Sequence, residues 1–195
     1  MLAFDARAGD RQALNTFVRR TQADVWRLAA HLVDAGAADD LTQETFERAV
    51  GALARFEGRS SARTWLLSIA RRVCMDELRR RTRRRSAMVR LGASVGVEGE
   101  LEPDATDGVA LAHLVDELED DRRQAFVLTQ LLGLSYEEAA EVCECPIGTI
   151  RSRVSRARED LLGLVLDGET AARPDVGSTD GPDEDLGRTA SDRRG

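Results

Sequence analysis

A stretch with few large apolar side chains, residues 92–108, divides this 195-residue chain into two blocks. It contains four glycines, Pro103 and a run of acidic residues, which is the composition of a flexible linker. Residues from 167 onward are rich in Gly, Asp, Pro and Ser, which is typical of a disordered tail. We therefore predict four segments: a domain at 1–88, a flexible acidic linker at 89–108, a second domain at 109–166 and an acidic, disordered tail at 167–195.

Apolar residues recur at helical spacing in both blocks, and no stretch shows the sustained alternation of a half-buried strand. In the second block Leu111, Leu114, Val115 and Leu118 stand at i, i+3, i+4 and i+7. Only 4% of the residues are aromatic, so the core must be built from Leu, Val, Ala and Ile. The predicted fold class is all-α, with two small helical domains.

The helix boundaries are also marked in the first block. Asp39 or Asp40 has a side chain suited to the N-cap of a helix that carries Leu41 and Val50. Residues 56–61 break the apolar pattern and predict a loop. Trp65 and the apolar residues after it then begin a helix that runs into a cluster of arginines.

Charge is distributed very unevenly along the chain. The formal net charge is −7, and all 28 basic residues are Arg. Residues 48–90 hold 13 Arg and three acidic residues, whereas residues 91–121 hold ten acidic residues and no Arg. An acidic average argues against a nucleic-acid-binding protein, but binding depends on where the charges lie. The segregation predicts a polyanion-binding segment followed by a polar linker.

Eight arginines between residues 71 and 85 form the centre of this basic segment. Arginines that face phosphates release counterions, which gives sequence-independent affinity for nucleic acid. Polar residues just before Trp65 form a loop that can hold an unstacked base. The alternatives are that Trp65 belongs to the core and that the arginines are only solvated. For Trp65 the core is favoured; for the arginines polyanion contact is favoured.

The second block contains a helix-turn-helix pattern between residues 134 and 162. Ser135 and Glu138 form a capping box that opens one helix, and Pro146 suits the first position of the next. Two short helices joined by a tight turn place the second helix in the DNA major groove. Its polar face can then read bases or contact phosphates. The alternative is an ordinary amphipathic helix with a solvated face.

Several classes of protein are excluded by simple counts. No window approaches 18 consecutive apolar residues, and the first eleven residues lack the apolar core of a secretory signal. Cys74, Cys143 and Cys145 are too few and too scattered for a disulfide framework or a zinc site, and we expect Cys143 to pack in the core. No arrangement of catalytic residues stands out. We predict a soluble, cytoplasmic protein without enzyme activity, metal or cofactor.

Three segments together resemble a known family. Residues 40–46, DLTQETF, are similar to region 2.2 of bacterial sigma factors of the extracytoplasmic-function (ECF) class, in the sigma-70 family. Residues 56–81 resemble regions 2.3 and 2.4, and residues 134–140 with 145–154 resemble region 4.2. Their order and spacing across a linker are specific to that family. The strings SSARTWLL and LLTQLLGLSY are similar to the actinobacterial sigma-C-like subgroup.

The resemblance implies a σ2 domain that binds core RNA polymerase and melts the promoter −10 element, and a σ4 domain that reads the −35 element. It implies the β′ clamp helices, the β flap and promoter DNA as partners, an anti-sigma factor as a further candidate partner, and no membrane insertion. The implied polymerase contacts are Asp40, Gln43 and Glu44. The implied −10 contacts are Arg59, Ser60, Ser61, Ala62, Arg63, Thr64, Trp65, Arg72, Arg79 and Arg80. The implied −35 contacts are Thr149, Arg151, Ser152, Ser155 and Arg156.

The chain departs from the family at two positions of the −10 pocket. Many members carry a bulky aromatic residue at the position of Ala62 and Asn at the position of Arg72. The resemblance therefore does not determine which base of the −10 element is captured. Two other functions also remain open from the residues alone. A free-standing helix-turn-helix regulator would account for residues 134–162 but not for 40–46. A protein-binding module would direct the basic segment to an acidic protein surface.

Overall fold

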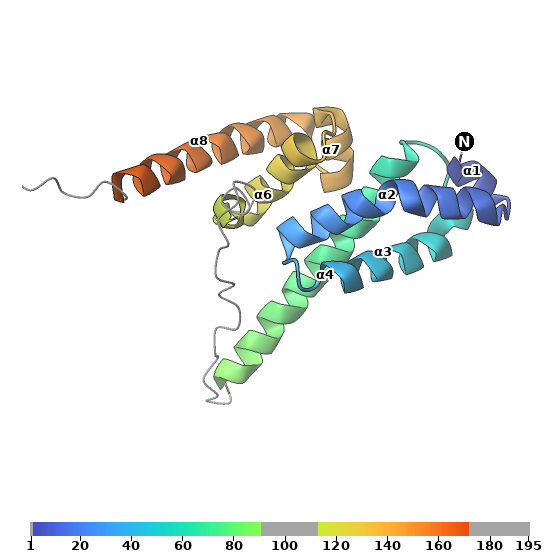
Figure 1. Cartoon of the computed structure of the whole chain (residues 1–195), viewed down its shortest axis with the longest axis horizontal. Helices are drawn as coiled ribbons and strands as arrows, with labels where there is room; N and C mark the ends of the chain where they lie inside the picture. The colour runs from blue at the N-terminus through green and yellow to red at the C-terminus, as the bar shows by residue number, and fades with distance from the viewer. Residues whose placement is uncertain (1, 91–112, 172–195) are drawn as a thin grey trace, which may run out of the picture.

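A computed structural model describes residues 2–90 and 113–171, with side chains up to residues 88 and 166 in the two ranges. Within these ranges all regular structure is helical, and the predicted all-α fold class is confirmed (Figure 1). The predicted linker lies outside the described residues apart from the end of one helix, as do Leu111 and residues 172–195 of the predicted tail.

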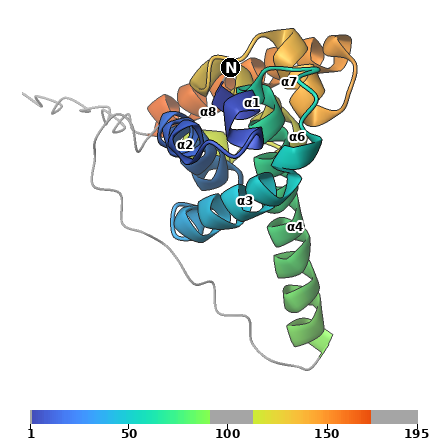
Figure 2. The same cartoon turned by 90° about the vertical axis from the view of Figure 1, so that its right-hand side faces the viewer.

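The first unit contains four α-helices and one short 3₁₀ turn. Its elements are α1 (Leu2–Arg7), α2 (Arg11–Leu32), α3 (Ala38–Ala52), η1 (Leu53–Arg55) and α4 (Ala62–Arg90). Helix α4 packs against both α2 and α3, and Leu28, Leu66 and Leu67 are almost fully buried there. The second half of α4 projects beyond the other helices (Figures 1 and 2).

The second unit is shorter and carries the helix-turn-helix. Residues 113–116 are helical, and they are followed by α6 (Asp120–Phe126), a π-helical turn η2 (Val127–Leu131), α7 (Tyr136–Cys143) and α8 (Ile147–Ala171). The π-helical turn is closed by a hydrogen bond from the Leu132 N–H to the Val127 carbonyl at 2.9 Å. The loop after it passes through Gly133 at a φ of 69°.

The predicted capping box at the start of α7 is confirmed. Ser135 Oγ accepts from the Glu138 N–H at 3.1 Å, and Glu138 Oε2 accepts from the Ser135 N–H at 2.9 Å. The hydrogen bond from the Ser135 backbone lowers the pKa of Glu138. The contribution of this cap to stability is therefore fully present at pH values above the ordinary pKa of glutamate. It is lost as the pH falls through the lowered pKa of Glu138.

Two other predicted helix starts are displaced. Helix α3 begins at Ala38, because the carboxylate of Asp34 accepts from the Ala37 N–H at 2.8 Å and closes the preceding turn. Asp39 and Asp40 therefore lie in its first turn, where the helix dipole still favours a carboxylate. Pro146 precedes the first residue of α8 by one position, and its carbonyl accepts from the Thr149 N–H at 2.9 Å.

The two units share one hydrophobic core. Helix α4 contacts α2 and α3 of its own unit and α7 of the second unit, and α2 contacts α6. One continuous cluster of buried side chains runs from Phe17 in α2 to Ala157 in α8. The sequence predicts two small domains, but not that they pack against each other.

Replacing the cap residue of α7 tests the helix-turn-helix fold. We expect Ser135→Ala to lower the free energy of unfolding by about 1 kcal/mol, since an N–H of the first turn loses its acceptor. Urea denaturation followed by circular dichroism measures this change. Ser152→Ala, an exposed serine inside α8, is the control and should change stability by less than about 0.5 kcal/mol. Equal losses in the two variants would contradict the capping role.

Candidate polymerase and nucleic-acid interfaces

The first candidate surface is the acidic side of α3. Asp40 and Gln43 are both exposed and stand three residues apart, which places them on one face of the helix. Gln43 Nε2 donates to Glu47 Oε1 at 3.0 Å. Glu44 is half-buried and pairs with Arg48 at 2.5 Å. Asp40 and Gln43 are thus accessible at the surface, whereas Glu44 is held by its ion pair with Arg48.

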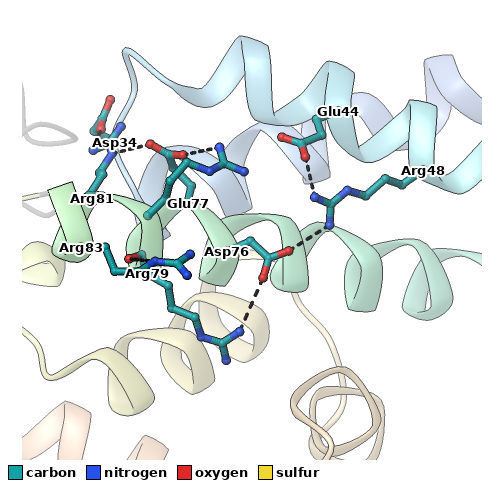
Figure 3. A network of polar contacts seen from close by, with 9 residues as sticks. Asp34, Glu44, Arg48, Asp76, Glu77, Arg79, Arg81 and Arg83 are labelled. Carbon is teal, nitrogen blue, oxygen red and sulfur yellow. Dashed lines mark hydrogen bonds and ion pairs between the residues drawn. The ribbon is translucent and has the colours of Figure 1, made fainter.

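Arg48 connects this acidic surface to α4. Its second nitrogen, Nη1, lies 3.1 Å from Asp76 Oδ2, and Asp76 Oδ1 lies 3.5 Å from Arg79 (Figure 3). The chain of contacts therefore runs from Glu44 in α3 through Arg48 to the basic part of α4. Arg48 is a residue that the sequence analysis missed, although its i,i+4 spacing from Glu44 is a recognisable ion-pair signal.

The basic segment of α4 is partly neutralised by the protein itself. Arg80 pairs with Glu77 at 2.8 Å. Arg81 pairs with Glu77 and with Asp34 of the α2–α3 connection (Figure 3). Arg83, Arg84 and Arg85 follow on the projecting half of the helix with exposed side chains. The free positive charge is thus concentrated further along α4 than the predicted contacts Arg79 and Arg80.

The loop at 56–61 lies between η1 and α4, as predicted. Its last residue, Ser61, accepts from the Thr64 N–H at 3.0 Å and so caps α4. Arg59 pairs with Glu57 at 2.6 Å and remains largely exposed. The loop forms an open pocket of about 270 Å³, lined by Arg55, Phe56, Glu57, Gly58, Arg59, Ser60 and Trp65.

Trp65 lies between the core and the loop. Its ring packs against Phe56 at a centroid distance of 5.1 Å, and it borders the hydrophobic core. It also lines the pocket of the loop. Ala62 is half-buried and packs beside the core.

Arg63 at the start of α4 is held by both units. Its Nε donates to Asp24 of α2 at 2.7 Å. Its Nη2 donates to the carbonyl of Leu132, in the loop after η2, at 2.6 Å. Hydrogen bonds from a guanidinium are among the stronger polar contacts in proteins. Two of the three guanidinium nitrogens of Arg63 therefore donate within this chain.

Three further polar contacts join α4 to the second unit. Arg71 Nε donates to Oε1 of the buried Gln124 at 2.6 Å, and Arg72 pairs with Glu144 at 3.0 Å. Thr64 Oγ1 lies 3.4 Å from Glu138. Of the predicted −10 contacts, Arg63, Thr64 and Arg72 thus face the helix-turn-helix unit. The sequence did not predict the hydrogen bond between Arg71 and Gln124, because this bond depends on how the two units pack.

Helices α7 and α8 form the helix-turn-helix. Glu144 ends α7 in the left-handed region at a φ of 55°, which turns the chain toward α8. Ile150, Val154 and Ala157 bury one face of α8. The opposite face is polar: Arg151, Ser152, Ser155 and Arg156 are exposed and Thr149 is half-buried. All five predicted −35 residues therefore lie on the side of α8 that faces away from its buried stripe.

The cysteines are candidate metal ligands and candidate reactive thiols. Within the described residues, no group of three or more His, Cys, Asp or Glu side chains is close enough to hold a metal ion. Burial raises the pKa of Cys74 to about 12 and that of Cys143 to about 11. Cys143 packs in the helix-turn-helix core, as predicted.

In the described ranges, no helix is both long and apolar enough to cross a membrane.

Comparisons with known proteins identify the family. The model of Sigma-70 region 2 matches residues 17–84, and the model of Sigma-70, region 4, matches residues 108–161. The chain is 52% identical over 163 residues to the ECF RNA polymerase sigma factor SigC of Mycobacterium tuberculosis, covering 83% of this chain and 88% of that protein. The chain belongs to the sigma-70 family. It is a sigma factor of the ECF class, which directs promoter recognition and transcription initiation.

More distant relatives agree with this assignment. The ECF sigma-E factor of Salmonella typhimurium strain LT2 is 34% identical over 170 residues, covering 77% of this chain and 85% of that protein. The sigma factor RpoE of Bartonella quintana, solved with the anti-sigma factor NepR, has a TM-score of 0.67 at 31% identity, covering 78% of this chain and 96% of that one. The predicted family and its sigma-C-like resemblance are confirmed.

Thiol labelling tests the burial of the cysteines. The thiolate is the reactive form, and a pKa near 12 leaves about one part in ten thousand ionised at pH 8. We expect an aromatic disulfide reagent at pH 8 to label the half-exposed Cys145 quickly, and Cys74 and Cys143 only after unfolding in guanidinium. Cys145→Ser is the control and should abolish the fast phase. Two fast thiols in the folded wild type would contradict the described burial.

Proposed function

We propose that this sigma factor uses three separate polar surfaces for three tasks: α3 for core RNA polymerase, the 56–61 loop with α4 for the −10 element, and α8 for the −35 element. The observation that carries the proposal is that one chain presents all three surfaces, which neither a helix-turn-helix regulator nor a simple protein-binding module requires. The polymerase makes the RNA, so we assign the chain no catalytic chemistry and place its action in the cytoplasm.

At the −10 element, the loop pocket and the basic helix have complementary tasks. The pocket beside Trp65 is lined by polar side chains and by two aromatic rings, which suits an unpaired base that stacks and accepts or donates hydrogen bonds. The exposed arginines of α4, Arg83 to Arg85, are suited to backbone phosphates of the opened strand.

We propose that the region-2 unit spans 1–88 and the region-4 unit 109–166.

At the −35 element, α8 supplies the residues that read bases. Arginine can bind guanine through two hydrogen bonds, and Ser can bond either bases or phosphates. Arg151, Ser152, Ser155 and Arg156 lie on the exposed face, with Thr149 near its edge. The buried face of α8 packs against α6 and α7 of the same unit, which holds the opposite, polar face toward solvent.

Promoter binding must exchange several contacts within the chain. Arg63 and Arg72 engage the second unit in this structure, so they reach DNA only when the units separate. Docking on the polymerase would supply the free energy for that exchange. RpoE of Bartonella quintana is bound by an anti-sigma factor. We propose that a partner of this class also binds the present chain.

Substitution in α8 tests the −35 role. We expect Arg156→Ala to weaken binding of the holoenzyme to its own −35 sequence by about 1–3 kcal/mol and binding to scrambled DNA much less, if Arg156 reads a base. Fluorescence anisotropy with both duplexes measures the difference. Arg158→Ala, on the same helix but bound to Gln130, is the matched control. Equal losses on the two duplexes would reduce Arg156 to a phosphate contact.

Substitution in α3 tests the polymerase surface. The double variant Asp40→Ala with Gln43→Ala should weaken binding of the full chain to core polymerase about tenfold or more, since both side chains are exposed for contact. Its far-ultraviolet circular dichroism should stay unchanged. The control, Glu141→Gln, removes an exposed carboxylate on α7. Wild-type affinity of the double variant for core polymerase would overturn this assignment.

A further inference from the structure

Helix α1 (Leu2–Arg7) lies before residue 17, where the match to the region 2 model begins, yet it packs on the 56–61 loop. Ala3 and Ala6 of α1 join Leu53 and Phe56 in a small hydrophobic cluster beside the main core. Figure 1 shows α1 next to the segment that leads into α4. The chain's first helix is therefore part of the wall behind the loop pocket.

Two side chains of α1 hold the start of the loop. Arg7 Nη1 donates to the carbonyl of Phe56 at 2.8 Å. The ring of Phe4 packs against the ring of Phe56 at a centroid distance of 5.3 Å, and Phe56 in turn packs against Trp65 at 5.1 Å. Phe4 is still 46% exposed, so burial in the core is not what places it there.

Phe4 also touches the backbone at the bend of the loop. Gly58 has a φ of 72°, a conformation that residues with a side chain rarely adopt. A Cβ atom built on Gly58 would lie 2.5 Å from Cζ of Phe4, closer than two carbon atoms can approach. The absence of a side chain at Gly58 thus lets the aromatic ring lie directly on the loop backbone.

The loop is consequently fixed at both ends. Phe4 and Arg7 hold its first residues, and Ser61 holds its last through the cap of α4. The residues between, 57–60, line the pocket together with Phe56 and Trp65. A pocket whose walls are preorganised loses less entropy when it takes up a ligand.

We propose that α1 shapes the base pocket of this sigma factor, with Phe4 and Arg7 as positioning residues that act through Phe56 and Gly58. The ligand is a single unpaired promoter base, and neither residue needs to touch it. This inference rests on the proposed −10 function of the 56–61 loop. It extends the specificity machinery to a helix that the match to the family model does not include.

The test uses holoenzyme formed from the full chain and core polymerase. The probes are single-stranded oligonucleotides carrying the −10 non-template strand of a promoter mapped for this protein, with each base substituted in turn. Fluorescence anisotropy gives the affinity for each oligonucleotide, and the ratio between preferred and substituted bases measures selectivity. Phe4→Ala and Arg7→Gln are compared with Arg7→Lys, which keeps a charged donor, and with Arg11→Gln, an exposed arginine at the start of α2.

We expect Phe4→Ala and Arg7→Gln to lower the selectivity at the captured base about tenfold, as loss of a charged hydrogen bond or its equivalent would. Arg7→Lys should recover part of it, and Arg11→Gln should match the wild type. Affinity for core polymerase should remain within about twofold of wild type in all variants, since α3 is untouched.

Three results would overturn the proposal. Unchanged selectivity in both variants would show that α1 does not shape the pocket, while a selective wild type would leave the loop's own role intact. A loss of core binding that parallels the loss of selectivity would reduce α1 to a structural element. A wild type without selectivity at any position would overturn the −10 role of the loop, and the role of α1 with it.

Discussion

Helix α4 is the element on which the rest of the structure depends. It packs against α2 and α3 on one side and α7 on another, and its residues Leu66, Leu67 and Ala70 are almost completely buried. Apolar burial of this kind is the main favourable contribution to folding. The same helix begins at the loop pocket and ends in exposed arginines, so the packing of one helix sets the positions of both surfaces that we propose for the −10 element.

The charge pattern follows from this arrangement. The average of −7 hides a basic α4 whose arginines are partly occupied by carboxylates of neighbouring helices. Ion pairs of this exposure contribute little to stability, typically below about 1 kcal/mol each. They do lower the net positive charge that free protein presents to DNA. These ion pairs therefore reduce the positive charge on the surface of α4, and breaking them costs little free energy.

The sequence predicts the helices and most of the candidate site because those depend on local order. Apolar spacing, the Ser135–Glu138 box and the face of α8 that carries Arg151 and Arg156 are all set within a few residues. The predicted start of α3 was wrong by a few residues. Asp34 closes the turn before the helix, whereas Asp39 or Asp40 was expected to be the cap. The partners of Arg71 and of Arg7 could not be predicted, since each bond spans about 50 residues and depends on tertiary packing.

The contacts between the two units show which atoms Arg63 and Arg72 would release in the proposed exchange for DNA. Arg63 donates to the Leu132 carbonyl, and Arg72 pairs with a carboxylate that is more than half exposed. Both acceptors are oxygen atoms with partial or full negative charge, as phosphate oxygens are, and a guanidinium binds either kind in the same planar geometry. The proposed exchange of these contacts for DNA would therefore replace one hydrogen-bonded acceptor with another instead of leaving the arginines unpaired. The apolar area between α4 and α7 has no such substitute in DNA, so its exposure is the part of the proposed opening that binding to the polymerase would have to offset.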